Sequence, residues 1–214
     1  SVGALNTSPY APRLSNTPFL ASLAERGAKV ERAYTVTPHT SKALVSIHCG
    51  RYPKLVPGVD EANAGGIPAK CLARLLAEQG FATAYFQPAE EHYERRSDLV
   101  KEFGFEHYVG KESLDGTGFD ESSYFGWEDD VLIQPVVDWA AQQKARFFLG
   151  LLTLTSHHPY GIPRGFPTQR FAPARDHNDY LNTLAYTDRF LKKLFAAFEA
   201  KGLADDTLFI IMGD

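Results

Sequence analysis

Residues 35–53 read TVTPHTSKALVSIHCGRYP, and their pattern predicts a strand, a tight turn and a short helix. Residues rich in Val, Tyr and Thr lead into Pro38, and an apolar run with helical spacing then ends at Gly50. Thr40 can serve as the N-cap of this helix, and Gly50 as the residue just past its C-terminus. A helix N-terminus presents free N–H groups and partial positive charge, so a phosphate or sulfate can bind there. Taken alone, a Thr at this place is most often only a cap, and its function depends on the rest of the chain.

The composition indicates a globular protein. The chain has 214 residues, 44% of them hydrophobic, which suits one domain or a large part of one. The net charge of −4 is spread along the chain and argues against nucleic acid as a general partner. Cys49 and Cys71 lack the spacing of a metal site, and we interpret them as two buried thiols.

Neither end of the sequence reads as a natural domain boundary. The chain begins at Ser1 without Met and stops at Asp214, directly after the apolar run LFIIMG. These two ends lead us to expect a piece of a longer protein that lacks sequence at both ends. Separately, no run of the sequence is long and apolar enough to span a membrane.

Predicted strands and helices alternate along the chain. The run RFFLGLLTLT at 146–155 is apolar almost throughout, as is typical of a central parallel strand covered on both faces. The other predicted strands are 81–87, 105–109 and 207–212, and the predicted helices are 18–26, 67–79, 90–103, 127–143 and 180–201. Alternation of this kind predicts an α/β fold with a mostly parallel central sheet and helices on both faces.

Three polar residues follow predicted strands: Thr40, His157 and Asp214. Open α/β sheets bind ligands beyond the carboxyl ends of their strands, so we expect these residues to share one site. A carboxylate at a strand end suits a hard metal ion, and a His beside an anion can protonate a leaving alkoxide. The plainer alternatives are that Thr40 and Asp214 cap a helix and a turn, and that the His is a solvated loop residue.

A fourth candidate is Arg96, in the charged segment HYERRSD at 92–98. Its guanidinium suits bidentate recognition of a phosphate group. A solvated helix face with mixed charges is an equally good interpretation of this segment. Asp188, in the last predicted helix, is interpreted as structural.

Several motifs resemble the sulfatase and alkaline-phosphatase superfamily. The ending Cys49-Gly-Arg-Tyr-Pro53 is similar to the Thr-Gly-Arg-Tyr-Pro that closes the nucleophile helix of sulfatases, and it puts Thr40 in the nucleophile slot. The Pro-Ser-Arg of the formylglycine-type sulfatases is absent, because residues 42–44 are Lys, Ala and Leu. Thr followed by Ser looks instead like the branch of lipoteichoic acid synthases and related phosphoglycerol and phosphoethanolamine transferases.

This resemblance implies a set of metal ligands. The run Ile-Ile-Met-Gly-Asp214 resembles the Gly-Asp-His-Gly strand end that binds metal in the superfamily. Thr40 and Asp214 are therefore expected ligands of one divalent cation, with the remaining ligands before Ser1 and after Asp214. Mn²⁺ is the first choice, and Zn²⁺ and Mg²⁺ are the alternatives.

The resemblance also implies substrate-binding residues. The segment TLTSHHPY at 153–160 is similar to the transferase pattern Thr-x-Thr-x-His-x-Pro, which gives His157 a catalytic and substrate-binding role. His158 falls where an aromatic residue often stands and is a further substrate-binding candidate. Counted back from Gly104, Arg96 matches a phosphate-binding Arg of the branch, whereas Glu94 replaces its Trp.

Residues 1–214 are thus expected to form one incomplete sulfatase-like catalytic domain. The implied activity is a metal-dependent phosphotransferase or phosphodiesterase that acts on a phosphoglycerol- or phosphoethanolamine-type phosphodiester through a phospho-threonine intermediate. The partners are then a phospholipid or other phosphodiester and a hydroxyl acceptor, with membrane attachment through a segment outside this chain and the domain outside the cytoplasm. The alternatives are a phosphatase or sulfuric ester hydrolase, or a non-catalytic anion-binding domain of the same fold.

Overall fold

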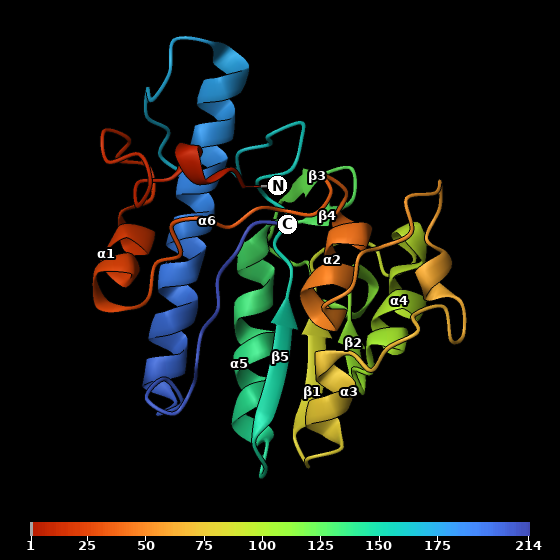
Figure 1. Cartoon of the computed structure of the whole chain (residues 1–214). Coiled ribbons are helices and arrows are strands. Elements are labelled where there is room, and N and C mark those ends of the chain that lie inside the picture. Colours follow the sequence, from red (N-terminus) through yellow and green to blue (C-terminus); the bar gives the residue numbers. More distant parts are fainter. Residues whose placement is uncertain (1) are drawn as a thin grey trace.

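The computed structural model describes residues 2–214 and contains a parallel three-stranded sheet (Figure 1). Its strands β1 (Ala82–Phe86), β2 (His107–Val109) and β5 (Phe147–Leu151) lie in the order β2-β1-β5. Ala84 of β1 is in register with His107 on one side and Leu149 on the other. Within the described residues β5 pairs only with β1, so β1 is the central strand of this sheet and the prediction for 146–155 is wrong on this point.

Helices cover both faces of the sheet, which confirms the predicted α/β fold (Figure 1). On one face lie α5 (Ile133–Gln142) and α6 (Arg175–Ala200), and on the other lie α2 (Thr40–Cys49), α3 (Leu72–Ala77) and α4 (Arg96–Phe103). Side chains alternate along β1, so Ala84 and Phe86 pack with α5 and α6 while Tyr85 packs with the other three helices. The core therefore has two halves, one on each side of β1.

Helix α1 (Pro18–Arg26) packs against α6 and has the predicted bounds. Thr17 precedes it and Gly27 follows it, as the sequence indicates. The cap comes from elsewhere, because both carboxylate oxygens of Asp188 accept hydrogen bonds from the amides of Phe19 (2.9 Å) and Leu20 (2.8 Å). Asp188 is structural, as interpreted from the sequence.

A small antiparallel hairpin lies at the carboxyl end of β1. It consists of β3 (Glu121–Ser123) and β4 (Gly126–Trp127), and Gly126 also bridges to Ala89 just after β1. Short 3₁₀ turns complete the structure at Ala4–Asn6, Asp60–Ala62, Tyr93–Arg95, Lys111–Ser113 and Asp129–Leu132. The helix predicted at 90–103 is therefore shorter, since α4 begins only at Arg96.

Two predicted strands do not form. The segment before Thr40 and the segment 207–212 contain no paired strand, and both expose large apolar side chains, including Tyr34 (86% exposed) and Leu208 (83% exposed). A strand is held by hydrogen bonds to a neighbour, so β-branched composition alone does not make one. Thr40 and Asp214 consequently do not follow regular strands.

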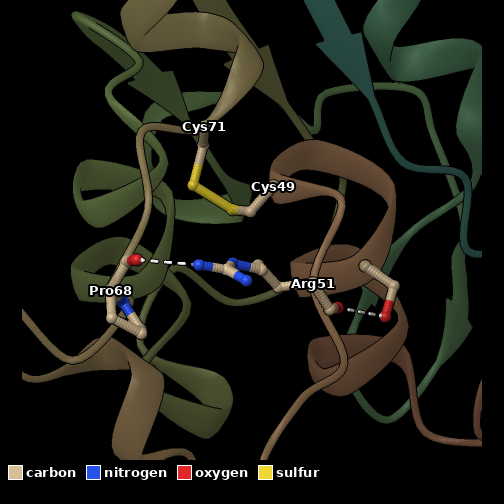
Figure 2. The surroundings of a disulfide bond; sticks show 5 residues. Cys49, Arg51, Pro68 and Cys71 are labelled. Carbon is tan, nitrogen blue, oxygen red and sulfur yellow. Dashed lines mark hydrogen bonds between the residues drawn. A yellow bond between two sulfur atoms is a disulfide. The ribbon is translucent and has the colours of Figure 1, made fainter.

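The two cysteines form a disulfide, so the prediction of two buried thiols is wrong (Figure 2). Cys49 is the last residue of α2 and Cys71 immediately precedes α3, and their Cα atoms lie 4.0 Å apart. The two helices pack on the same face of the sheet, which brings the ends together. Because the proximity arises from tertiary packing, the spacing of the cysteines in the sequence did not reveal it.

His48 of α2 is buried in an aromatic cluster. The centroid of its ring lies 5.0 Å from that of Phe103, 5.4 Å from that of Phe105 and 6.0 Å from that of Tyr85. Burial lowers the pKa of His48 from 6.5 to about 4. The imidazole is therefore neutral in the folded protein at neutral pH.

We predict that His48 makes the protein less stable in mild acid. The unfolded chain takes up a proton at His48 below pH 6.5, whereas the folded protein does so only near pH 4. The contribution of His48 is complete above pH 6.5 and falls by at most roughly 3 kcal/mol as the pH drops to 4. Urea unfolding between pH 7 and 4 should show this loss in the wild type and not in His48→Phe, with exposed His177→Gln as control. Equal pH dependence in wild type and His48→Phe would disprove the assignment.

Candidate active site

Helix α2 begins at Thr40. His39 is the N-cap residue, with extended backbone angles (φ −147°, ψ 112°), so the predicted N-cap lies one residue too late. The first hydrogen bond of the helix joins the amide of Ala43 to the carbonyl of His39, which leaves the amides of residues 40–42 without an acceptor in the helix. The Thr40 side chain is half-buried, and within residues 2–214 its hydroxyl has no hydrogen-bond partner. Thr40 is therefore available at the positive end of the helix.

Arg96 lies directly behind this helix end. The residue is 4% exposed, and its guanidinium donates to the Ser41 Oγ (3.0 Å) and to the Gln87 Oε1 (3.2 Å). Its Nε is buried without a partner among the described residues. The interpretation of this segment as a solvated helix face is wrong for Arg96, because the side chain points inward and joins α2 to the end of β1.

Glu94 places a carboxylate beside Thr40 that the sequence analysis did not assign to the site. Its Oε1 lies 3.1 Å from the His39 Nε2, and its Oε2 accepts a hydrogen bond from the Ser41 hydroxyl (2.6 Å). Glu94 and Arg95 both have positive φ angles (51° and 56°), which residues other than glycine rarely adopt. Such strain concentrates at functional sites. The signal in the sequence was the replacement of the family's Trp by Glu94.

Asp214 is linked to Arg96 through the phenol of Tyr85, on which both of their charges act. Burial raises the pKa of the Tyr85 phenol to about 12, the positive charge of Arg96 opposes this, and the Asp214 carboxylate raises it further. The charges of Asp214 and Arg96 therefore both act on the phenol of Tyr85, a residue of β1. The structure thus brings Thr40, Arg96 and Asp214 into one region.

His157 is connected to this region by ring contacts in an aromatic cluster. Its ring centroid lies 5.0 Å from that of Phe125 on the hairpin, and the ring of Phe125 lies 4.3 Å from that of Tyr93, next to Glu94. The His157 Nδ1 is 2.7 Å from the carbonyl oxygen of His158. Because a carbonyl only accepts, Nδ1 carries the proton and the Nε2 of His157 is left for a substrate.

His158 is separated from His157 despite being its neighbour. It is exposed, and its ring lies beside that of Tyr160 (5.7 Å between centroids) rather than against the hairpin. The structure therefore does not bring His158 together with the other candidate residues.

Asp129 holds the segment that carries His157. Its buried carboxylate accepts hydrogen bonds from the amides of Leu154 (2.6 Å) and Thr155 (3.2 Å), and its own amide donates to the Thr155 Oγ1 (3.0 Å). Burial raises the pKa of Asp129 from 3.8 to about 6 against these bonds. No sequence motif identified this residue, since its only local signal was the acidic run Glu128-Asp129-Asp130.

We predict that Asp129 gives the protein an opposite pH dependence to that of His48. Between pH 4 and 6 the folded protein binds the proton of Asp129 more tightly than the unfolded chain does. The stabilisation is complete below pH 3.8 and is lost, by at most roughly 3 kcal/mol, as the pH rises through 6. Asp129→Asn, which cannot ionise, should lack this decrease in urea unfolding curves.

The control for this experiment is Asp138→Asn, an exposed carboxyl on α5. It should leave the pH dependence of unfolding as in the wild type. The assignment fails if Asp129→Asn and the wild type lose the same stability between pH 4 and 6.

Comparison with known proteins identifies the family of this chain. A family model described as Sulfatase matches residues 1–214, the entire chain, and the chain therefore belongs to the sulfatase family. This confirms the resemblance drawn from the motifs around Thr40 and Asp214. The sulfatase-like fold and membership in a superfamily of enzymes are confirmed with it.

Two curated relatives are similar over most of the chain. The chain is 26% identical over 148 residues to the lipoteichoic acid synthase of Staphylococcus saprophyticus, covering 66% of the chain and 22% of that protein. It is 26% identical over 187 residues to phosphoglycerol transferase I of Xanthomonas campestris, covering 82% of the chain and 26% of that protein. The chain thus spans about a quarter of the length of these relatives.

Solved structures share the fold. The crystal structure of the lipoteichoic acid synthase LtaP from Listeria monocytogenes is similar, with a TM-score of 0.73 and 20% identity. The match covers 90% of the present chain and 48% of the LtaP chain. The C-terminal periplasmic domain of EcEptC from Escherichia coli, in complex with Zn, matches 94% of the chain and 57% of its own, with a TM-score of 0.68 and 15% identity. At these identities the likeness shows the fold alone.

Proposed function

We propose that this chain forms part of the catalytic domain of a phosphotransferase or phosphodiesterase that uses Thr40 as nucleophile. One observation carries the proposal: the Thr40 hydroxyl has no partner within residues 2–214, and it stands at the positive end of α2 next to the buried Arg96. The proposed substrate is a phosphodiester of the phosphoglycerol type, which the names of the two curated relatives support, or of the phosphoethanolamine type, which only the sequence motifs support.

The reaction proceeds in two displacements. The Thr40 oxygen bonds to phosphorus and loses its proton to water, while the P–O bond to the substrate alcohol breaks. His157, protonated at Nε2, gives its proton to the departing alkoxide, and a phospho-threonine remains. Water or an acceptor hydroxyl then attacks the phosphorus and gives its proton to His157. The P–O bond to Thr40 breaks, and the Thr40 oxygen takes a proton back from water. The free amides of α2 and the Arg96 guanidinium offset the charge that builds on the phosphate oxygens.

The residues present supply part of a metal site. The Thr40 hydroxyl and the Asp214 carboxylate are hard oxygen donors, which suit Mn²⁺ or Mg²⁺ and are also found around Zn²⁺. Residues 2–214 contain no group of three or more His, Cys, Asp or Glu side chains arranged to hold a metal ion. We infer that these two donors belong to a larger ligand set in the intact protein. A bound cation would lower the pKa of the attacking hydroxyl and offset charge on the phosphate.

We predict that divalent metal binding depends on Asp214. The intact protein should bind one equivalent of Mn²⁺, Zn²⁺ or Mg²⁺, whereas the 214-residue chain should bind metal weakly because it supplies only two ligands. Elemental analysis after reconstitution and dialysis measures the bound metal directly. Asp214→Asn in the intact protein should reduce the metal content, and Asp205→Asn, on the exposed turn before it, should not. An intact protein that retains no metal would rule out this part of the proposal.

We predict that Thr40→Ala abolishes turnover and leaves the fold intact. Loss of a nucleophile lowers activity by on the order of 10⁴–10⁶-fold. Thr40 makes no cap hydrogen bond, so the substitution should cost about 1 kcal/mol or less in unfolding free energy. Mass spectrometry of enzyme quenched during turnover of a phosphoglycerol or phosphoethanolamine lipid should find the phosphoester on Thr40.

Ser41→Ala is the control, because both hydroxyls lie in the same tryptic peptide and fragmentation must separate them. Ser41 is fully buried and bonded to Glu94 and Arg96, so its loss should lower stability yet leave the phospho-threonine detectable. A folded Thr40→Ala variant with near-normal turnover would leave Thr40 as a structural residue and favour the non-catalytic anion-binding domain.

We further infer that the domain works outside the cytoplasm. The Cys49–Cys71 disulfide supports an oxidising compartment, since such bonds persist there and are rare in the cytosol. Among residues 2–214 no helix combines the length and the apolar character needed to cross a bilayer. From the resemblance to the transferases, we propose membrane attachment through a segment outside this chain, with a phosphodiester lipid and a hydroxyl acceptor as partners.

A further inference from the structure

The loop of residues 51–58, RYPKLVPG, carries large apolar side chains on the outside of the protein. Tyr52 is 88% exposed and Leu55 is 85% exposed, and the neighbouring Val56 is 46% exposed. Pro53 lies between Tyr52 and Leu55, Pro57 follows Val56, and both prolines limit the conformations of the loop. Contiguous apolar side chains at a surface mark an interaction site more often than single ones do.

The exposure of these side chains is built into the fold, because the loop is fixed at its base. The Cys49–Cys71 disulfide lies just before it, the Ser46 Oγ donates to the Arg51 carbonyl (2.9 Å), and the Arg51 Nη2 donates to the Pro68 carbonyl (3.3 Å) (Figure 2). These contacts hold the first residue of the loop and leave the next side chain, Tyr52, pointing into solvent.

The middle of the loop is fixed as well. The Lys54 amide donates to the Glu61 Oε1 (2.6 Å), and the other carboxylate oxygen of Glu61 pairs with the buried Lys42 of α2 (2.7 Å). Glu61 is 3% exposed, so this anchor lies inside the protein. Leu55 therefore projects outward from a fixed backbone position.

The charge of the loop is opposite to that of the chain. Residues 51–58 contain two cations, Arg51 and Lys54, and no acid, whereas the chain has a net charge of −4. The nearest carboxylate oxygen to the Lys54 Nζ is that of exposed Asp60, at 3.9 Å, which is a weak pair. Cations beside Tyr and Leu match a bilayer surface, where anionic headgroups lie next to apolar chains.

The loop also lines an open cleft together with residues on either side of Thr40. This open cleft has a volume of about 400 Å³ and is lined by Thr37, His39, Lys42 and residues 54–58. Its lining includes the apolar residues 55–57 of the loop and His39, the residue before Thr40. A lipid that entered from a bilayer in contact with the loop would present its phosphodiester near the free end of α2.

We propose that the 51–58 loop docks on an anionic lipid bilayer and inserts Tyr52 and Leu55 among the headgroups. Docking directs the mouth of the cleft toward the membrane, so that a lipid substrate reaches Thr40 without leaving the bilayer. This inference rests on the proposed function in one respect, namely that the substrate is a lipid phosphodiester. It adds a contact made by this chain itself to any attachment made by other segments.

Vesicle binding tests the docking without any turnover. The protein should sediment with vesicles of phosphatidylglycerol and phosphatidylcholine, and less with phosphatidylcholine alone. Tyr52→Asp and Leu55→Asp should each lower the affinity for the mixed vesicles about tenfold, and Lys54→Glu about tenfold or more through reversal of charge. Leu5→Asp is the matched control, because Leu5 is 77% exposed on a different segment, the 3₁₀ turn at Ala4–Asn6, and should change nothing.

The docking proposal is overturned if the wild type does not bind the mixed vesicles. It is also overturned if Leu5→Asp lowers binding as much as Tyr52→Asp does, because the loop then has no special role. If Tyr52→Asp still binds the mixed vesicles but no longer binds an acidic protein surface, the loop is assigned to a protein partner instead. Unfolding curves that match the wild type confirm that the variants are folded, as expected at such exposed positions.

Turnover separates this proposal from the proposed function. Tyr52→Asp should lower the rate on a vesicle-embedded phosphoglycerol lipid about tenfold and leave the rate on a soluble short-chain analogue unchanged. An equal loss on both substrates would contradict docking, because the substitution would then act on the reaction itself. If the wild type turns over neither substrate, the proposed function fails, and the vesicle-binding result still decides the docking.

Discussion

The buried guanidinium of Arg96 is the interaction on which the site depends. Burial of its charge is costly unless its N–H groups meet acceptors, and both terminal nitrogens do so, whereas the Nε has no acceptor among the described residues. The acceptors are the side chains of Gln87, at the end of β1, and Ser41, in the first turn of α2. One side chain thus fixes the start of α2 against the central strand. The positive φ angles of Glu94 and Arg95 allow the chain to turn so that Arg96 points inward, at a cost of about 1–3 kcal/mol per strained residue.

Two further links hold α2 along its length. Lys42, in the first turn, pairs with Glu61 in a setting where both side chains are buried, and loss of one partner from such a pair costs about 3–5 kcal/mol. Cys49, at the last position, is bonded to Cys71. Thr40 consequently stands on a helix that is fixed at both ends, which suits a nucleophile that must meet phosphorus within a fraction of an ångström.

Local patterns predicted the elements whose signals are local. The bounds of α1, the position of β1 and the long α6 follow from capping residues and periodicity, and the motif spacing identified Thr40 and Arg96 as candidates. The strands predicted before Thr40 and at 207–212 failed because a strand requires a neighbour that local sequence does not specify. The disulfide, the burial of Arg96 and the role of Asp129 depend on residues 20 or more positions apart, so they became visible only in the folded chain.

The disulfide also determines what happens when the protein is cut. Cys49 and Cys71 close a covalent ring that includes the whole of the exposed 51–58 loop. A protease that cleaves this loop opens the ring but does not separate the two pieces, and α2 and α3 remain joined through sulfur. The nicked protein therefore travels as one species under non-reducing conditions and divides into two fragments only after reduction. This exposed apolar loop is thus placed where a single cut does not release either half of the fold.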